Sequence, residues 1–444
     1  MSQTKILLSL ALAASSFGAG AAYSQTSTTA PTVRFHATLG DIDVVLTPGV
    51  APLTVANFLN YVSKGAYVNS IFHRSVPGFI IQGGGYQLQN HAPVATPQSP
   101  AVKNEFNVTN ARGTIAMAKL GTDPNSATNQ WFFNLANNGA NLDKQNGGFT
   151  VFGRVANSGG LAVMDKIAAL PVYNYGSPFD QLPLNNLKGT RQDANFVLVT
   201  SIVQLPYVTP AGIESGATFA STNTNGIAPG EVLTLFGTAI GPSQLATLTL
   251  DGNGVVTNSL GGTRVLFDGT PAPLLYTSGS QIGVVAPQNL AGKSTVEVIV
   301  EYLNVQTAGM QFPVVPANPG IFTLNTSGSG DGAIIRPDGT IINTANPAQP
   351  GDILTLYGEG YGSAAPVLAD GTIVGSTLPV PAGAVTLLID GQSVDTTYAG
   401  GAPALIQGVL QINFQVPALT PGSHQIQVQV SGRTSPFGVT LQTK

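Results

Sequence analysis

Arg74 and Gln82 are polar residues in a stretch of large apolar side chains that runs from Phe72 to Gly85. An arginine is almost never fully buried without a partner, so Arg74 must meet an acceptor or line the wall of a pocket. Three consecutive glycines, residues 83–85, end the stretch and allow another backbone or a ligand to approach closely. A guanidinium fixed at a pocket wall could act as a hydrogen-bond donor in a reaction. Taken alone, Arg74 is better explained by a structural ion pair or a cap than by a catalytic role.

The composition favours a mainly β chain of several domains. Its 444 residues predict about three domains at ~150 residues each. Only 9% of the residues are charged, whereas Gly (53) and Pro (31) are abundant, so we expect short strands joined by many turns. The net charge of -4 and the lack of a basic run exclude nucleic acid as a partner. The chain has no cysteine, and its four histidines lack metal-ligand spacing, so no metal and no cofactor are expected.

The first 24 residues have the layout of a secretory signal peptide. A short positive start precedes an apolar run from Ile6 to Ala14 and a tail of small residues, with cleavage expected after Ala21 or Ser24. A membrane anchor is the alternative, but the run is well short of the ~20 residues that span a bilayer. We therefore expect a protein exported to the periplasm, the cell envelope or the exterior, with no membrane span after cleavage.

A hairpin and two helices are the elements expected to position Arg74. Residues 33–46 alternate in polarity around a Gly-Asp turn, which predicts a β-hairpin. Apolar residues at helical spacing predict a helix that opens at Pro52, with Thr54 as its N-cap, and ends at Gly65. A second helix is predicted over 161–170, before a proline. Short β-like segments lie between the helices, and this pattern predicts a closed or sandwiched β domain.

The Phe72–Gly85 stretch resembles the signature of the cyclophilins, the prolyl cis/trans isomerases. Its Phe-His-Arg, Pro-Gly-Phe and Gln-Gly-Gly elements match that signature almost letter for letter. Four further segments that resemble family motifs follow in the family's order, at residues 112–118, 129–132, 142–143 and 151–155. The resemblance covers about residues 32–205. It implies a cyclophilin-like eight-stranded antiparallel barrel with two capping helices, and we place this domain at residues 31–206.

The resemblance also implies a role for each matching residue. Arg74 is expected to be the catalytic arginine, and Gln82 is expected to hold it in place beside the substrate. The other expected substrate-binding residues line a proline pocket and the adjoining groove: Phe79, Ile80, Phe132, Leu142, Ala118, Lys119, Gln130 and Phe149. Asn141 and Phe149 stand where many members have tryptophan and histidine, so weak cyclosporin affinity is expected. Trp131, the single tryptophan, should face the barrel core.

The second half of the chain differs from the first in composition and in its pattern of strands and turns. A polar segment rich in Ser, Thr, Asn and Gly, residues 207–225, is predicted to be a linker. Beyond it, the segment Pro229–Gly237 recurs as Pro350–Gly358. Short strands alternating with Gly, Pro and Asp turns predict two immunoglobulin-like (Ig-like) β-sandwich domains, residues 226–325 and 326–444. This half is similar to the Ig-like C-terminal region of many exported acidobacterial proteins, and we expect it to bind an envelope or extracellular partner.

The sequence thus predicts an exported peptidyl-prolyl cis-trans isomerase that acts on proline-containing polypeptides and assists the folding of exported proteins. One alternative is a non-catalytic proline-binding module, which the presence of both Arg74 and Gln82 disfavours. The other is an adhesion or structural protein of the cell envelope, in which the β-sandwiches carry the function.

Overall fold

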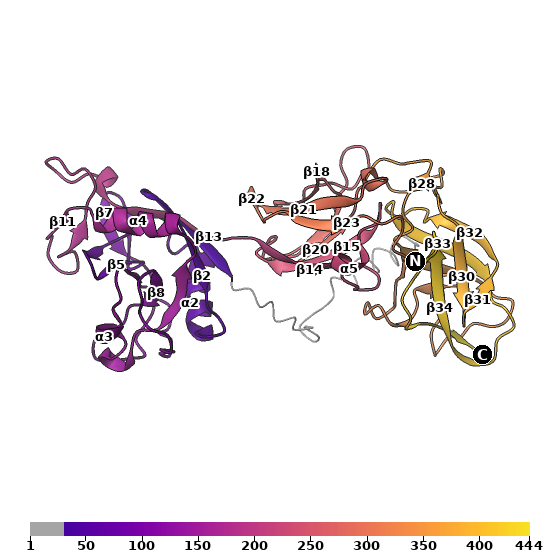
Figure 1. Cartoon of the computed structure of the whole chain (residues 1–444), viewed down its shortest axis with the longest axis horizontal. Coiled ribbons are helices and arrows are strands. Elements are labelled where there is room, and N and C mark those ends of the chain that lie inside the picture. Colours follow the sequence, from indigo (N-terminus) through magenta and orange to yellow (C-terminus); the bar gives the residue numbers. More distant parts are fainter. Residues whose placement is uncertain (1–30) are drawn as a thin grey trace. The chain divides into compact units, whose positions relative to one another are not determined.

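The computed structural model describes residues 31–444, and the predicted signal peptide lies outside the described residues. The chain divides into two compact units, one ending at Leu205 and the other comprising Pro206–Lys444. Both units are built mainly of β-strands (Figure 1). Within residues 31–444, no helix is long and apolar enough to cross a membrane.

The first unit contains one antiparallel sheet in the order β4-β5-β9-β8-β10-β2-β1-β13-β3-β6-β7. The sheet has eleven strands, whereas the sequence resemblance implied eight, because short segments such as β3, β4 and β7 also pair. The strands are β1 (Thr32–Ala37), β2 (Gly40–Leu46), β3 (Ser70–Ile71), β4 (Arg74–Val76), β5 (Ile80–Gly83), β6 (Tyr86–Gln89), β7 (Ala92–Ala95), β8 (Thr114–Met117), β9 (Trp131–Asn134), β10 (Val151–Val155) and β13 (Leu198–Gln204).

The two predicted helices are confirmed as α2 (Pro52–Ser63) and α4 (Ser158–Ala168), and both bury apolar residues in the core of this unit. The remaining elements of the unit are short: α3 (Gly139–Leu142), η1 (Gln145–Gly147), η2 (Asp193–Asn195) and the pair β11 (Val172–Tyr173) and β12 (Leu182–Pro183).

The prediction that Thr54 caps α2 is wrong. Ala51 occupies the N-cap position, and Pro52 opens the helix, where its missing N–H costs nothing. The cap comes from Glu105, whose carboxylate accepts hydrogen bonds from the backbone N–H of Leu53 (3.0 Å) and of Thr54 (2.8 Å). A carboxylate is favoured there by the free N–H groups and by the helix dipole. A partner so distant in sequence could not be identified from the local pattern.

The aromatic core of the first unit surrounds Trp131, which is fully buried. Its ring lies edge-on to those of Phe35, Phe72 and Phe133, with centroids 5.1, 5.4 and 5.6 Å away. The predicted inward orientation of Trp131 is therefore confirmed. A Cβ at Gly83 would lie only 2.6 Å from the indole ring, so this glycine is required by the chain's own core.

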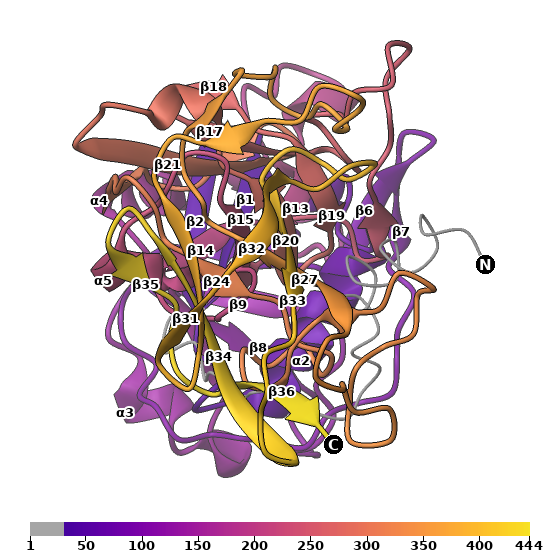
Figure 2. The same ribbon diagram turned by 90° about the vertical axis from the view of Figure 1, so that its right-hand side faces the viewer.

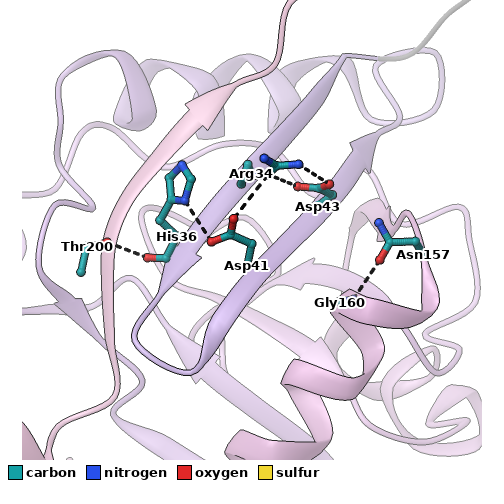
Figure 3. A network of polar contacts seen from close by, with 7 residues as sticks. All are labelled: Arg34, His36, Asp41, Asp43, Asn157, Gly160 and Thr200. Atoms are coloured by element: carbon teal, nitrogen blue, oxygen red, sulfur yellow. Dashed lines mark hydrogen bonds and ion pairs between the residues drawn. The ribbon is translucent and has the colours of Figure 1, made fainter. Parts of the chain in front are cut away.

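Polar pairs cover the outer face of the β1–β2 hairpin (Figure 3). Arg34 donates two hydrogen bonds to Asp43, its cross-strand partner, at 2.7 and 2.9 Å. The Nδ1 atom of His36 lies 2.9 Å from a carboxylate oxygen of Asp41. The alternate positions are apolar and fully buried, so the predicted hairpin is confirmed with one face in the core. Asn157, also drawn in Figure 3, caps α4 by accepting from the backbone N–H of Gly160.

The second unit begins with two five-stranded sheets around one apolar core. One sheet has the order β14-β15-β20-β19-β16, and in the other β18, β17, β21 and β22 follow one another while β23 also pairs with β21. The strands are β14 (Tyr207–Ser215), β15 (Val232–Thr238), β16 (Ala246–Thr247), β17 (Thr263–Phe267), β18 (Thr270–Pro271), β19 (Leu274–Thr277), β20 (Gln281–Val285), β21 (Thr295–Tyr302), β22 (Val305–Gln306) and β23 (Met310–Pro313), with η3 (Gln288–Leu290) after β20.

The prediction of a linker at residues 207–225 differs from the structure. This segment forms β14, which pairs with β15, and the short helix α5 (Thr222–Asn225). Val208 and Ile213 of β14 are buried in the core, and the Thr222 hydroxyl donates to the backbone carbonyl of Ile213. The polar composition misled the prediction, because backbone pairing and two apolar anchors suffice to order the segment.

A second pair of sheets follows around its own core. β27 pairs with β33, and β30 pairs with β34, as β15 pairs with β20 and β17 with β21 in the preceding sheets. Near the carboxyl end of the chain, β34 also pairs with β36 (Figure 2). The strands are β24 (Gly320–Ile321), β25 (Gly330–Asp331), β26 (Ile334–Ile335), β27 (Ile353–Glu359), β28 (Ala364–Ala365), β29 (Val380–Pro381), β30 (Val385–Ile389), β31 (Gln392–Val394), β32 (Thr396–Gly401), β33 (Val409–Gln415), β34 (Gly422–Val430), β35 (Arg433–Thr434) and β36 (Val439–Thr443).

Two fully buried carboxyl groups link segments of the second unit. Glu359, at the end of β27, accepts hydrogen bonds from the Ser215 hydroxyl (2.6 Å) and from the backbone N–H of Val232 (2.9 Å). Glu231 accepts from Asn318 Nδ2 at 2.7 Å. Burial raises the pKa of Glu359 to about 7. Burial and the neighbouring Glu359 raise the pKa of Glu231 well above its usual range, so this pair retains a proton near neutral pH.

Candidate active site

Cross-strand pairing brings the candidate residues onto one face of the first unit's sheet. Arg74 in β4 lies opposite Gln82 in β5, and Gln82 lies opposite Phe132 in β9. Residues directly opposite one another in an antiparallel pair point to the same side of the sheet. Their neighbours Ile81 and Phe133 point to the other side and belong to the aromatic core. The alternation therefore separates a candidate site from the core within the same strands.

An apolar cluster on this face contains most of the predicted binding residues. Its buried members are Ile80, Ala116, Phe132, Leu142 and Val151, and the partly buried residues packed against them are Val76, Phe79, Ala118 and Phe149. The rings of Phe132 and Phe149 meet edge to face, with centroids 5.7 Å apart. The structure thus brings together Phe79, Ile80, Ala118, Phe132, Leu142 and Phe149, as the sequence predicts. This cluster is distinct from the core around Trp131.

Arg74 is half-buried, and a neutral side chain holds its guanidinium. Its Nε–H donates to the amide oxygen of Gln181 at 3.0 Å. In the part of the chain that the structure describes, Arg74 forms no ion pair, whereas Arg34, Arg112, Arg264 and Arg336 each do. The contacts of Arg74 therefore fit a residue at the wall of a pocket better than a member of a structural ion pair.

Gln82 does not hold Arg74, contrary to the prediction. Although Gln82 lies opposite Arg74, its Nε2 donates to the amide oxygen of Gln130 at 2.9 Å. Gln130 in turn packs against Gly85, where a Cβ would lie 2.8 Å from the Gln130 amide carbon. The residue that does hold Arg74, Gln181, lies 107 positions along the chain. The sequence around Gln181 contains two prolines, Pro178 and Pro183, and no motif that indicated a functional site.

Lys119 is bound to the loop that carries Phe149. Its ammonium donates to the backbone carbonyls of Asn146 and Gly148, each at 2.6 Å, and lies 4.8 Å from the centre of the Phe149 ring. Burial lowers the pKa of Lys119 below its ordinary value. These contacts tie Lys119 to the loop at the edge of the apolar cluster.

Comparison with known proteins identifies the family. The model of the family "Cyclophilin type peptidyl-prolyl cis-trans isomerase/CLD" matches residues 32–188. A peptidyl-prolyl cis-trans isomerase of Acinetobacter baylyi is 42% identical over 147 residues, which are 32% of this chain and 75% of that protein. The chain belongs to the cyclophilin-type peptidyl-prolyl cis-trans isomerases.

Two further relatives agree with this assignment. Peptidyl-prolyl cis-trans isomerase A of Dickeya dadantii is 39% identical over 161 residues, 35% of this chain and 80% of the relative. Peptidyl-prolyl cis-trans isomerase B of Escherichia coli is 43% identical over 143 residues, 30% of this chain and 82% of the relative. The cyclophilin match therefore covers most of the first unit. The enzymatic activity of this domain is peptidyl-prolyl cis-trans isomerisation.

An asparagine network is hydrogen-bonded to the backbone of the apolar cluster in the cyclophilin domain. Asn138 donates to the backbone carbonyl of Phe79 and to the side chain of Asn134, each at 2.8 Å. Asn110 donates to the backbone carbonyl of Phe149 at 3.0 Å. The asparagines are buried, and their hydrogen bonds hold the backbone of two cluster residues. Sequence analysis missed this network, for which the run of asparagines from 134 to 141 was the available signal.

His73, the neighbour of Arg74, is a neutral residue at physiological pH. Burial lowers its pKa to about 4, and the positive charge of Arg74 contributes to this shift. The His73 ring packs edge-on to Tyr86, with centroids 5.1 Å apart. His73 therefore does not add a second positive charge beside Arg74.

Proposed function

We propose that Arg74 catalyses isomerisation by donating a hydrogen bond to the prolyl nitrogen of the substrate as the amide twists. Double-bond character of the peptide C–N bond gives a barrier of ~18–20 kcal/mol. At the twisted transition state the nitrogen loses conjugation and becomes an acceptor. A donor fixed in advance then stabilises the transition state more than the ground state. No covalent step is required.

The observation that carries this proposal is the position of Arg74. Its half-buried guanidinium shares one sheet face with Phe132 and is free of ion pairs within the described residues. A charged partner would compete with the substrate nitrogen, whereas the neutral amide of Gln181 occupies only Nε. We propose that the terminal N–H groups of the Arg74 guanidinium are the ones that donate to the substrate.

We assign the apolar cluster to the proline ring. Phe79, Ile80, Phe132, Leu142 and Phe149 would contact the ring and exclude water, which strengthens the hydrogen bond from Arg74. The residues beside the cluster would contact the substrate backbone: Gln82, Ala118, Lys119 and Gln130. The substrates that we propose are proline-containing polypeptides.

We further propose that the enzyme acts on exported proteins outside the cytoplasm. The signal-peptide pattern of residues 1–24 supports export to the periplasm, the envelope or the exterior. We interpret the β-rich second unit as two Ig-like sandwiches, residues 226–325 and 326–444, that attach the enzyme to an envelope or extracellular partner. The equivalent pairings β15–β20 and β27–β33 support a duplicated arrangement.

A protease-coupled assay on the full-length chain tests this function. A peptide whose X-Pro bond must be trans for cleavage reports the isomerisation rate. We expect the parent chain to accelerate the slow cis fraction and Arg74→Ala to lose most of that acceleration. A parent chain that binds the peptide without accelerating it would instead indicate a proline-binding or adhesion protein.

A further inference from the structure

Gln181 is the residue that holds Arg74 in the described structure. Its amide oxygen accepts from Nε of Arg74 at 3.0 Å, across 107 positions of sequence. Gln82, although directly opposite Arg74 in the neighbouring strand, has its side chain committed to Gln130. The orientation of the guanidinium is therefore set from outside the strands that carry the apolar cluster.

The backbone at Gln181 is itself fixed. Its carbonyl oxygen accepts from the N–H of Ser75 at 2.8 Å, so Gln181 is tied to β4 by its main chain as well as by its side chain. The next residue, Leu182, is fully buried and begins β12, which pairs with β11. Leu182 packs with Ile71 in a separate apolar cluster. The side-chain amide of Gln181 therefore binds Arg74 from a backbone that is itself held in place by hydrogen bonds and by the buried Leu182.

The guanidinium is planar, and a hydrogen bond at Nε sets the direction in which its two terminal nitrogens point. We propose that Gln181 is a positioning residue for the isomerase reaction, which fixes the donor fork of Arg74 toward the prolyl nitrogen. This inference rests on the proposed catalytic role of Arg74. A neutral acceptor suits this task, because it orients the guanidinium without neutralising its charge.

Three substitutions test the hydrogen bond. Gln181→Leu removes the acceptor at nearly constant volume, and we expect kcat to fall about tenfold, the scale of one hydrogen bond to a charged group. KM should change little, because the apolar cluster that binds the ring is untouched. Gln181→Glu keeps an acceptor oxygen at the same reach but adds a negative charge that can also bind the terminal N–H groups, so its kcat should stay below that of the parent. Gln89→Leu alters an exposed glutamine of the same unit and should match the parent.

A double-mutant cycle separates positioning from a structural role. If Gln181 acts only through Arg74, Gln181→Leu should have no effect on kcat in an Arg74→Ala background, measured at raised enzyme concentration. Trp131 fluorescence, which reports unfolding of this unit alone, normalises each variant to its folded fraction. Equal loss of kcat in both backgrounds, or full activity of Gln181→Leu, would overturn the proposal. Full activity of Arg74→Ala would instead refute the catalytic role of Arg74 on which it depends.

Discussion

Replacing Glu359 by glutamine should make the second unit less sensitive to alkaline pH. The Glu359 carboxyl is fully buried, and burial raises its pKa from 4.5 to about 7. Because the folded state holds the proton more tightly than the unfolded state, stability is fully present below pH ~4.5 and is lost as the pH rises through about 7. Glutamine has no proton to lose, so its contribution does not change over this range.

The size of the effect follows from the shift in pKa. At ~1.4 kcal/mol per unit, the rise to about 7 corresponds to roughly 3 kcal/mol of unfolding free energy lost between pH 5 and pH 8.5. The glutamine amide can accept from the N–H of Val232 and donate to the hydroxyl of Ser215, as a protonated carboxyl can. Glu359→Gln should therefore be close to the parent at pH 5 and more stable than the parent at pH 8.5.

Urea unfolding of the full chain at a series of pH values measures this difference. Far-UV circular dichroism follows both units, and Trp131 fluorescence identifies the transition that belongs to the first. Asp395→Asn, which neutralises an exposed carboxylate of the second unit, is the matched control and should follow the parent. If Glu359→Gln loses stability with rising pH as steeply as the parent, or is the less stable chain at pH 8.5, the assignment of a buried protonated carboxyl is wrong.

Three further predictions follow from the first half of the chain. The unfolding free energy of the first unit should fall by up to roughly 3 kcal/mol as the pH falls from 6.5 toward 4. The cause is that the buried His73 resists protonation, whereas the same histidine in the unfolded chain does not. If the unfolding transition reported by Trp131 responds to acid equally in His73→Gln, this explanation is wrong. A truncated chain ending at Leu205 should retain the isomerase activity of the full chain, because the division between units lies there; an insoluble or inactive product would show that the units depend on one another. Mass spectrometry of protein from its native host should find an amino terminus near Ala22 or Gln25, whereas an intact terminus on a cytosolic protein would refute export.

The candidate site was largely predictable because its residues lie in short, contiguous motifs. The stretch from Phe72 to Gly85 and the later Gln-Trp-Phe segment become β4, β5 and β9, which are neighbours in the sheet. Strand alternation places Phe132 and Trp131 on opposite faces of β9, and the resemblance to the cyclophilins assigned Phe132 to the site. The sequence therefore indicated which residues belong to the candidate site and which side of the sheet each of them faces.

The contacts that sequence analysis missed are made by residues far apart in the chain. Glu105 replaces Thr54 as the cap of α2, and Gln181 replaces Gln82 as the partner of Arg74. A hydrogen bond of this kind leaves no periodicity and no local spacing, since it depends on the path of the intervening chain. The predicted linker failed for a related reason: residues 207–225 are rich in Ser, Thr, Asn and Gly, but the backbone of β14 within them pairs with that of β15.

The rate of prolyl isomerisation by Arg74→Ala is the most direct test of the account. Loss of one preorganised donor should lower kcat/KM by about 10²–10³, equivalent to ~2.7–4 kcal/mol of barrier. Thermal stability should change little, because Arg74 is half-buried and its hydrogen-bond partner is the neutral Gln181. Arg74→Lys should also be strongly impaired, because lysine keeps the charge without the planar fork. A variant that melts far below the parent yet isomerises normally at low temperature would contradict the catalytic role of Arg74.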